Sequence, residues 1–237
     1  MVSSIQVELE RGTLNGNLSV DADSSGLVIF AHGSGSSRFS PRNQFVARYL
    51  ERSGLATLLI DLLTEAEEEI DQRTREFRFD IPLLAGRLGK VAHWAVQQSA
   101  LKSLPIGYFG ASTGAAAALI AAAEQPGQVR AVVSRGGRPD LAAESLGQVQ
   151  CPSLFIVGSL DQTVLRLNLD AIAQLPTETI RTLEIIEGAS HLFEEPGTLE
   201  EVADVAASWF RKYLANMGAR KPYPVNSGGA GAGSRFT

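Results

Sequence analysis

The chain has 237 residues, of which 44% are hydrophobic and 20% charged, and its net charge is −5. This length and composition suit one globular domain and exclude a disordered or fibrous protein. The excess of acidic groups argues against binding nucleic acid through bulk positive charge. A single cysteine excludes an internal disulfide framework and cysteine-rich zinc sites. The three histidines are widely separated in sequence and no pair has a ligand spacing such as HxxxH, so we expect no metal site.

The N-terminal segment MVSSIQVELERG lacks the basic and apolar regions typical of a signal peptide. The longest uncharged apolar run, at 115–123, is about half of the roughly 18 residues that a membrane helix needs. We therefore expect a soluble, cytoplasmic protein that engages neither a membrane nor a nucleic acid. The sequence leaves the oligomeric state open.

Two segments at the start of the chain, 4–10 and 13–20, predict a β-hairpin with Asn15-Gly16 as an internal turn or bulge. Short, continuous apolar runs follow, which is typical of parallel strands buried on both faces: 27–31, 55–62, 105–109, 129–134, 153–157 and 182–186. Helical patterns lie between or after them, at 41–53, 80–99, 113–124, 164–175 and 199–216. This alternation predicts one α/β domain over 1–217, with a mostly parallel eight-stranded sheet and helices on both faces.

Three stretches bear on what surrounds this domain. Residues 65–71 carry five acidic groups and predict a solvated surface helix or loop. The segment 218–237, rich in Gly and Pro, predicts a flexible tail or a linker remnant. Only about 18 residues separate Ser134 from Ser153, which leaves room for one short helix. We therefore expect no large cap domain, and an open, shallow surface at the carboxyl ends of the strands.

A candidate nucleophile lies where a buried-strand run meets an alanine-rich helix. The segment Gly110-Ala111-Ser112-Thr113-Gly114 has the G-x-S-x-G pattern of a nucleophile elbow, in the strand–turn–helix setting that this turn requires. Small residues two positions before and after the serine let the chain turn sharply. A tight βα turn without chemistry is the alternative interpretation.

Two further residues complete a candidate catalytic triad. A serine hydroxyl needs a base, and His191 follows the last predicted strand. Asp161 follows another strand and would orient that histidine, although an ordinary helix N-cap is the competing role. The chain order Ser112, Asp161, His191 is that of α/β-hydrolases. Glu187 and Glu194 are fallback acids.

Backbone N–H groups are candidates for an oxyanion hole. Thr113 directly follows the serine, and Ser34 lies in the glycine-rich loop 31–37 after the first parallel strand. A phosphate cradle is the alternative interpretation of that loop. It lacks both the Walker lysine and a G-x-G-x-x-G pattern.

These residues give the chain a resemblance to a known family. With His32-Gly33, the G-x-S-x-G turn, Asp161 and His191, residues 4–216 resemble the α/β-hydrolase superfamily and look most like its dienelactone-hydrolase-like group. The HGSGSSR loop and the segment 157–161 carry the closer likeness. True dienelactone hydrolases use a cysteine nucleophile and a glutamate in the loop after the third strand. Here Ser112 stands at the nucleophile position and that loop has no acidic residue, so the resemblance implies serine esterase chemistry.

Arginines near the predicted site suggest a basic rim on an acidic protein. We expect Arg38, Arg135 and Arg138 to bind substrate, with Arg42 nearby, because a guanidinium fork suits a carboxylate. Pairing with local acids is the alternative.

The function predicted from these features is a serine hydrolase that cleaves small-molecule esters, lactones or thioesters through an acyl-enzyme, without a metal or an organic cofactor. The open site expected without a cap domain favours small to medium acyl groups. Acyl transfer or perhydrolysis by the same triad is a second interpretation. A non-catalytic α/β-hydrolase-fold binding module is a third.

Overall fold

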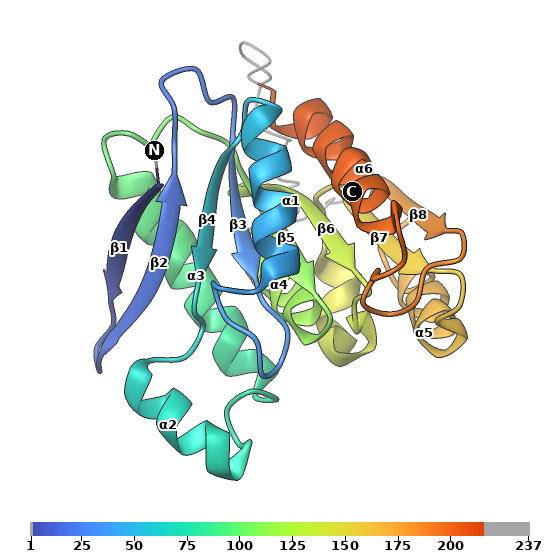
Figure 1. Ribbon diagram of the computed structural model, residues 1–237, viewed down its shortest axis with the longest axis horizontal. Helices are drawn as coiled ribbons and strands as arrows, with labels where there is room; N and C mark the ends of the chain where they lie inside the picture. Colours follow the sequence, from blue (N-terminus) through green and yellow to red (C-terminus); the bar gives the residue numbers. More distant parts are fainter. Residues whose placement is uncertain (1, 216–237) are drawn as a thin grey trace, which may run out of the picture.

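One eight-stranded sheet organises the protein in the computed structural model, which describes residues 2–215 (Figure 1). Its order is β1-β2-β4-β3-β5-β6-β7-β8, with β2 antiparallel to both neighbours and the pairs from β4 to β8 parallel. The strands are β1 (Val2–Glu8), β2 (Thr13–Ser19), β3 (Leu27–Ala31), β4 (Ala56–Ile60), β5 (Ile106–Ala111), β6 (Val129–Arg135), β7 (Ser153–Gly158) and β8 (Arg181–Ile186). The predicted α/β fold is confirmed. The tail predicted at 218–237 lies outside the described residues.

Asn15 and Gly16 do not form a turn, contrary to the prediction. Both lie inside β2, where Asn15 pairs with Gln6 and Gly16 with Ile5 across the hairpin. The chain reverses at 9–12 instead, where the Leu9 N–H donates to the Gly12 carbonyl. Apolar side chains on one face fill the space that a side chain at Gly16 would need. The glycine therefore serves close packing within the strand and does not mark a turn.

Helices cover both faces of the sheet, as Figure 1 shows. One face carries α1 (Pro41–Arg52) and α6 (Thr198–Leu214), and the other carries α3 (Ile81–Gln97), α4 (Thr113–Glu124) and α5 (Gln162–Ile172). The two faces bury separate apolar clusters. Five of the six parallel strands, β3 to β7, are buried throughout or nearly so, which explains their continuous apolar runs. The sixth, β8, was expected to be buried as well, but it is the last strand of the sheet and only Ile186 in it is buried.

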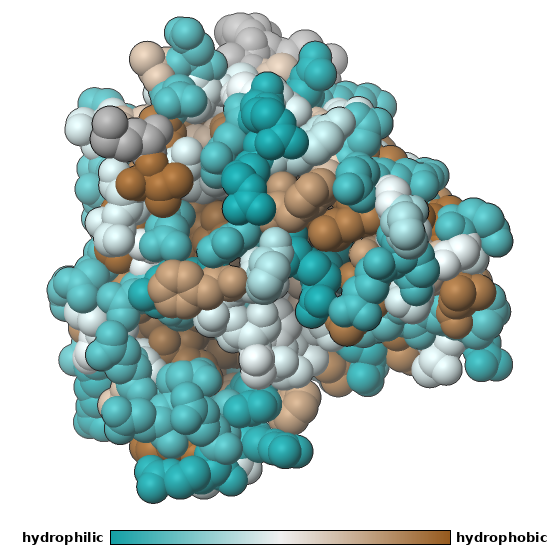
Figure 2. All heavy atoms as spheres, in the orientation of Figure 1, coloured by the Kyte–Doolittle hydropathy of each residue, from teal (hydrophilic) through white to brown (hydrophobic). Residues whose placement is uncertain are grey.

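The acidic segment forms a helix, α2 (Glu65–Thr74), which projects beyond the sheet. Thr64 and Glu67 form a capping box at its start. Hydrophilic side chains cover this helix in Figure 2, as expected of a solvated surface. Asp71 is the exception, since it is buried and accepts hydrogen bonds from the backbone of Phe77 and from the Arg78 side chain.

Between β6 and β7 the described chain forms only short helical turns, η1 (Pro139–Gln148), which are interrupted by a kink at Ala143. No cap domain therefore covers the carboxyl ends of the strands from this connection. Among residues 2–215 no helix is both long enough and apolar enough to cross a bilayer.

Candidate active site

Ser112 lies in a strained turn between β5 and α4. Its backbone adopts φ 51° and ψ −120°, a left-handed φ that a non-glycine residue rarely adopts. The Ser112 N–H donates to the Arg135 carbonyl at 3.1 Å, and the Ser112 carbonyl accepts from the Arg138 N–H at 3.1 Å. The end of β6 and the loop after it therefore hydrogen-bond to both the N–H and the carbonyl group of the serine.

Two glycines make this turn possible. A methyl group on Gly110 would overlap the backbone of Ala115, and one on Gly114 would overlap the carbonyl oxygens of Ala31 and His32. Backbone atoms cannot move aside as a flexible side chain can. The glycine spacing around Ser112 therefore reflects close packing of α4 against β3 and β5, as a nucleophile elbow requires.

Asp161 and His191 form a direct hydrogen bond. Nδ1 of His191 lies 2.6 Å from Oδ2 of Asp161. The other carboxylate oxygen of Asp161 accepts the Val164 N–H at 3.3 Å and so caps α5. The two roles considered for this aspartate from sequence thus occur together, one on each oxygen. The fallback Glu194 instead forms an ion pair with Arg42 at 3.2 Å.

Hydrogen bonds join the two loops that carry Asp161 and His191. The Ser159 N–H donates to the Ile186 carbonyl, and the Leu160 N–H donates to the Ala189 carbonyl. The Gly188 N–H in turn donates to Ser159 Oγ at 2.8 Å. The adjacency of β7 and β8 in the sheet brings these loops together. Their mutual bonds fix the orientation of the imidazole relative to the carboxylate.

The loop after β6 adjoins both the serine and the histidine. Gly136 has a φ of 51°, and a methyl group there would lie 3.1 Å from the His191 carbonyl oxygen and 3.6 Å from Cε1. The buried side chain of Asn168 donates to the Gly137 carbonyl at 3.0 Å. Sequence reasoning missed Asn168, because an Asn within a helix gives no sign of the loop it will bind.

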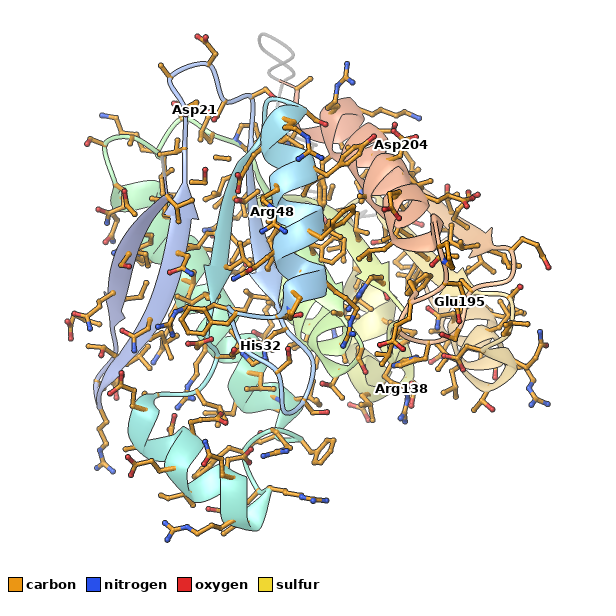
Figure 3. The ribbon with its side chains drawn as sticks, viewed as in Figure 1. Asp21, His32, Arg48, Arg138, Glu195 and Asp204 are labelled. Carbon is orange, nitrogen blue, oxygen red and sulfur yellow. The ribbon has the colours of Figure 1, made fainter. Side chains whose placement is uncertain are left out.

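His32 anchors the loop after β3 rather than taking part in the candidate triad. Its Nε2 accepts the Leu62 N–H at 3.1 Å, so the proton resides on Nδ1, which donates to the Gly33 carbonyl at 3.0 Å. Burial lowers the pKa of His32 below its ordinary value, which keeps the ring neutral. In Figure 3 His32 lies near the edge where the parallel strands end.

The two predicted oxyanion donors lie next to each other. The Ser34 N–H donates to Thr113 Oγ1 at 2.8 Å, so this donor already has an acceptor, which the sequence did not indicate. The Thr113 N–H belongs to the first turn of α4, where N–H groups have no intrahelical acceptor. Gly33 also adjoins the serine, since a methyl group on it would lie 3.2 Å from Ser112 Cβ.

The three predicted substrate-binding arginines differ in their partners. Arg38 forms an ion pair with Asp61 and Arg138 one with Asp140, which is the local pairing considered as the alternative. Arg135 is buried, and its Nε and Nη1 atoms have no hydrogen-bond partner in the described chain. Arg135 is therefore the one of the three whose charge the surrounding protein leaves uncompensated.

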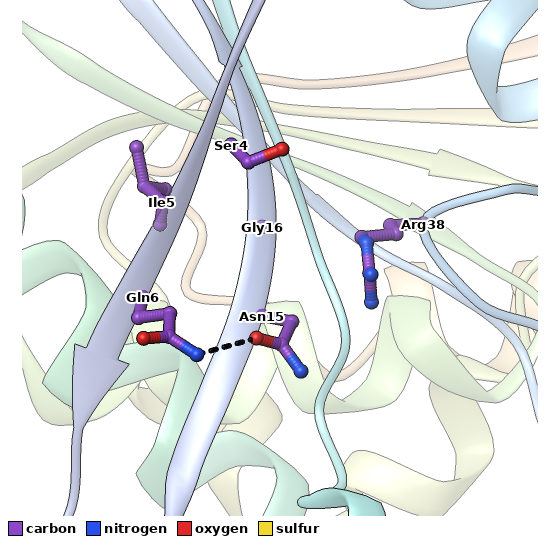
Figure 4. Close-up of a pocket in the computed structure, with 6 residues that line it drawn as sticks. All are labelled: Ser4, Ile5, Gln6, Asn15, Gly16 and Arg38. Carbon is purple, nitrogen blue, oxygen red and sulfur yellow. Dashed lines mark hydrogen bonds between the residues drawn. The ribbon is translucent and has the colours of Figure 1, made fainter.

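One pocket lies away from the candidate triad. It has a volume of about 350 Å³ on the hairpin face and is lined by Ser4, Ile5, Gln6, Asn15, Gly16 and Arg38 (Figure 4). A smaller hollow lies beneath the loop after β3, between His32 and Arg78.

The other histidine and the cysteine lie outside this arrangement. His93 is exposed on α3 and contacts Gln97. Cys151 is buried, which raises the pKa of its thiol to about 12. Within residues 2–215 no three His, Cys, Asp or Glu side chains gather in a way that could hold a metal ion.

Comparison with known proteins shows what this arrangement resembles. No family model matches the chain. A crystal structure of dienelactone hydrolase from Anabaena variabilis ATCC 29413 is 55% identical, covers 90% of this chain and 98% of its own, and superposes with a TM-score of 0.88. Est1E from Butyrivibrio proteoclasticus (15% identity, 89% of this chain, 98% of its own, TM-score 0.73) shares the fold. So does the esterase domain of a Rhodothermus marinus protein (18% identity, 91% of this chain, 100% of its own, TM-score 0.70).

Curated relatives come from two strains of Mycobacterium tuberculosis. Each is named as a candidate phosphoribosyl transferase and is 56% identical over 203 residues, or 86% of this chain. The match spans 44% of each relative, so the chain covers less than half of their length.

Proposed function

Because the chain belongs to the dienelactone-hydrolase-like group of the α/β-hydrolases, we propose that it is a serine hydrolase of carboxylic esters, lactones or thioesters. One observation carries this proposal most directly. The 2.6 Å contact between His191 and Asp161 lies at the edge of the sheet where Ser112 occupies its strained turn. A carboxylate-oriented imidazole beside a serine at a strand–helix turn is the arrangement that acyl transfer needs.

The proposed reaction has two halves. Ser112 Oγ attacks the carbonyl carbon while His191 Nε2 takes the hydroxyl proton, and the tetrahedral intermediate collapses as the leaving alcohol or thiol takes that proton. Water then loses a proton to His191 and attacks the acyl-enzyme, which releases the acid and restores the serine. Asp161 holds the imidazole tautomer and stabilises the imidazolium that forms in each half.

The oxyanion formed in each half needs N–H donors. We assign the Thr113 N–H as one donor, because it directly follows the nucleophile. For the other, the Ser34 N–H must be shared with Thr113 Oγ1 or released from it when substrate binds. The contact between Ser34 and Thr113 thus makes the threonine hydroxyl part of the proposed site, because it sets the position of the loop.

The surroundings of the site favour small to medium acyl groups. The η1 connection provides no cap, so no deep acyl tunnel forms on that side. Exposed apolar side chains lie on loops at the same sheet edge, among them Phe39, Leu160 and Leu192. Phe79 is exposed as well and is a further candidate for contact with substrate. Phe77, two residues earlier, packs against the core instead.

Acyl transfer to an acceptor other than water, or perhydrolysis, would use the same residues. A non-catalytic binding module would have no need of the strained serine and the oriented histidine together. The name of the mycobacterial relatives describes proteins more than twice as long as the matched region, and it supports no assignment for the site described here.

Labelling with a fluorophosphonate probe tests the proposal. We expect the folded protein to be modified at Ser112, with labelling abolished in Ser112→Ala and strongly reduced in His191→Ala. Ser99→Ala removes an exposed serine after α3 and serves as the matched control, which should label like the wild type. Failure of the folded wild-type protein to label would overturn the catalytic proposal in favour of a binding module.

Substrate size gives a second measurement. We expect 4-nitrophenyl acetate to be hydrolysed faster than the palmitate ester, because the site lacks a tunnel for a long chain. Faster turnover of the palmitate ester would contradict the open-site argument.

A further inference from the structure

Helix α5 holds two polar side chains that reach different loops of the candidate site. Asp161 caps its start, and Oδ2 of this residue lies 2.6 Å from Nδ1 of His191. Asn168 lies about two turns further along the helix, and its Nδ2 donates to the Gly137 carbonyl at 3.0 Å. Because the helix between them is a rigid element, it fixes the two contacts relative to each other.

The loop that Asn168 contacts also binds the candidate nucleophile. The Arg135 carbonyl accepts the Ser112 N–H, and the Arg138 N–H donates to the Ser112 carbonyl, both at 3.1 Å. Gly137 lies between these two residues in the chain. A methyl group on Gly137 would overlap side-chain atoms of β6 and α4, so the loop packs closely there. The hydrogen bond from α5 thus acts on the segment that holds Ser112.

The same loop adjoins the candidate base. The Gly136 N–H donates to the Ile156 carbonyl of β7 at 2.8 Å. A methyl group on Gly136 would lie 3.1 Å from the His191 carbonyl oxygen. A continuous path of contacts therefore runs from His191 through Asp161, α5 and Asn168 to the loop that holds the serine.

The amide group of Asn168 is fixed in one orientation. The residue is 0% exposed, and its Nδ2 donates to the Gly137 carbonyl and also to the Val164 carbonyl at 2.8 Å. Oδ1, in contrast, is buried and has no hydrogen-bond partner within residues 2–215. A buried polar atom without a partner lowers stability, and a leucine of similar volume would avoid that cost. The asparagine at this position therefore calls for an explanation beyond packing.

We propose that Asn168 is a positioning residue, which holds the loop after β6 so that Ser112 and His191 face each other at a reactive distance. Asn168 acts through the Gly137 carbonyl and does not touch the substrate. This inference rests on the proposed hydrolase function. A displacement of about 1 Å between reacting groups can lower a rate by a factor on the order of 10². Loss of the Asn168 hydrogen bond should therefore slow the chemical step and leave substrate binding largely unchanged.

Asn168→Leu tests this role, because it removes both N–H donors at nearly constant volume. We expect kcat for 4-nitrophenyl acetate to fall roughly tenfold to a hundredfold, with little change in KM. The rate of fluorophosphonate labelling at Ser112 should fall by the same factor. The free energy of unfolding should stay the same or rise, because the unpartnered Oδ1 is removed as well. A role confined to stability predicts the opposite, which is fewer folded molecules with an unchanged kcat per folded molecule.

Gln174→Leu is the matched control. Gln174 Nε2 also donates to the carbonyl four residues earlier, that of Asp170, at 3.0 Å, but the residue is exposed. Its replacement should leave kcat, KM and the labelling rate unchanged. Asn168→Gln keeps the N–H donors on a longer side chain and should retain more activity than Asn168→Leu. If Asn168→Leu fails to fold, Asn168→Ala removes the same donors without a bulky group.

Hydrogen exchange examines the loop without any reaction. The Arg138 N–H, which donates to Ser112, should exchange roughly threefold to tenfold faster in Asn168→Leu, the factor expected for the loss of one hydrogen bond. Amides of the buried strand β5 should not exchange faster than in the wild type. Gln174→Leu should change neither rate. Two-dimensional NMR of each variant measures both.

These measurements separate the inference from the proposed hydrolysis. If the wild type is labelled and hydrolyses esters, while Asn168→Leu matches it in kcat and in Arg138 exchange, the hydrolase stands and the positioning role is overturned. If the wild type is not labelled, the hydrolase is rejected, and faster Arg138 exchange in Asn168→Leu still shows that Asn168 holds the loop. A uniform rise in exchange across β5 and the loop would make Asn168 a stabilising residue only and overturn the inference.

Discussion

Oδ2 of Asp161 lies 2.6 Å from Nδ1 of His191, while Oδ1 of the same carboxylate caps α5 through the Val164 N–H. One side chain thus links the start of a helix to the candidate catalytic base. The rigid helix end holds the carboxylate, and the carboxylate holds the imidazole. Stability and activity should therefore respond differently to substitutions that spare one of these bonds.

Asp161→Asn is expected to separate the two roles. Asparagine is as good an N-cap as aspartate, so the free energy of unfolding should change little. Its NH₂ group facing Nδ1 would impose the wrong imidazole tautomer, and kcat should fall by a factor on the order of 10⁴. Urea unfolding and ester hydrolysis measured on the same preparation provide the comparison.

Asp80→Asn is the matched control, because Asp80 caps α3 through the Leu83 N–H at 3.0 Å and has no histidine partner. Asp80→Asn should alter neither the free energy of unfolding nor the rate of ester hydrolysis. Equal activity of Asp161→Asn and wild type would show that the His191 contact has no catalytic role.

Gly114→Ala should destabilise the protein strongly. The added methyl group would overlap the carbonyl oxygens of Ala31 and His32, so β3 and α4 would have to separate. We expect a loss of about 1–3 kcal/mol, the range for overpacking in a close-packed interior. Gly86→Ala in α3 is the opposite case, because nothing lies within 4 Å of the added group. It should stabilise by roughly 0.5–1 kcal/mol. Thermal unfolding of both variants measures these effects. Similar changes in Tm for Gly114→Ala and Gly86→Ala would contradict this account of the turn.

His32 should make stability depend on pH. Burial lowers its pKa in the folded protein below the ordinary 6.5, so the unfolded chain binds the proton more readily. The free energy of unfolding should be fully expressed above pH 6.5 and should fall as the pH drops below it. In His32→Gln, the side-chain oxygen can still accept the Leu62 N–H. The fall in the free energy of unfolding below pH 6.5 should disappear in this variant.

Urea titrations between about pH 5 and 7.5 measure this pH dependence largely apart from that of two acids paired with arginines, Glu67 and Asp71. Hydrogen bonds from Arg87 and Thr64 outweigh burial and lower the pKa of Glu67, and those from Arg78 and Phe77 do the same for Asp71. Their contribution is lost below their ordinary values of 4.5 and 3.8. An identical slope in His32→Gln and wild type would exclude His32 as its source.

Cys151 should be inert in the folded protein. Burial raises the pKa of its thiol to about 12, so almost no reactive thiolate exists near neutral pH. Iodoacetamide at pH 8 should leave the folded protein unmodified and modify it in urea, as mass spectrometry would show. Cys151→Ala should retain ester hydrolysis. Loss of activity on alkylation of the native protein would instead implicate the cysteine.

Local patterns in the sequence were sufficient to identify the strands, most helix boundaries and the G-x-S-x-G turn. Parallel strands buried on both faces must be apolar throughout, and a helix that packs closely on a sheet must begin with small residues. These constraints act on neighbouring residues and can be recognised without coordinates. The same reasoning misplaced a turn at Asn15-Gly16, because pairing with β1 and β4 outweighed a local turn preference.

The partners of polar side chains depended on the tertiary structure. Only the adjacency of β7 and β8 brings Asp161 to His191, and only the packing of loops shows that Ser34 donates to Thr113. The same holds for the arginines. Arg38 and Arg138 form ion pairs with carboxylates, whereas Nε and Nη1 of Arg135 have no hydrogen-bond partner in the described chain. Hydropathy and spacing determine which residues are buried and which elements form. Which charges meet depends on contacts between segments far apart in the chain, which only the tertiary structure brings together.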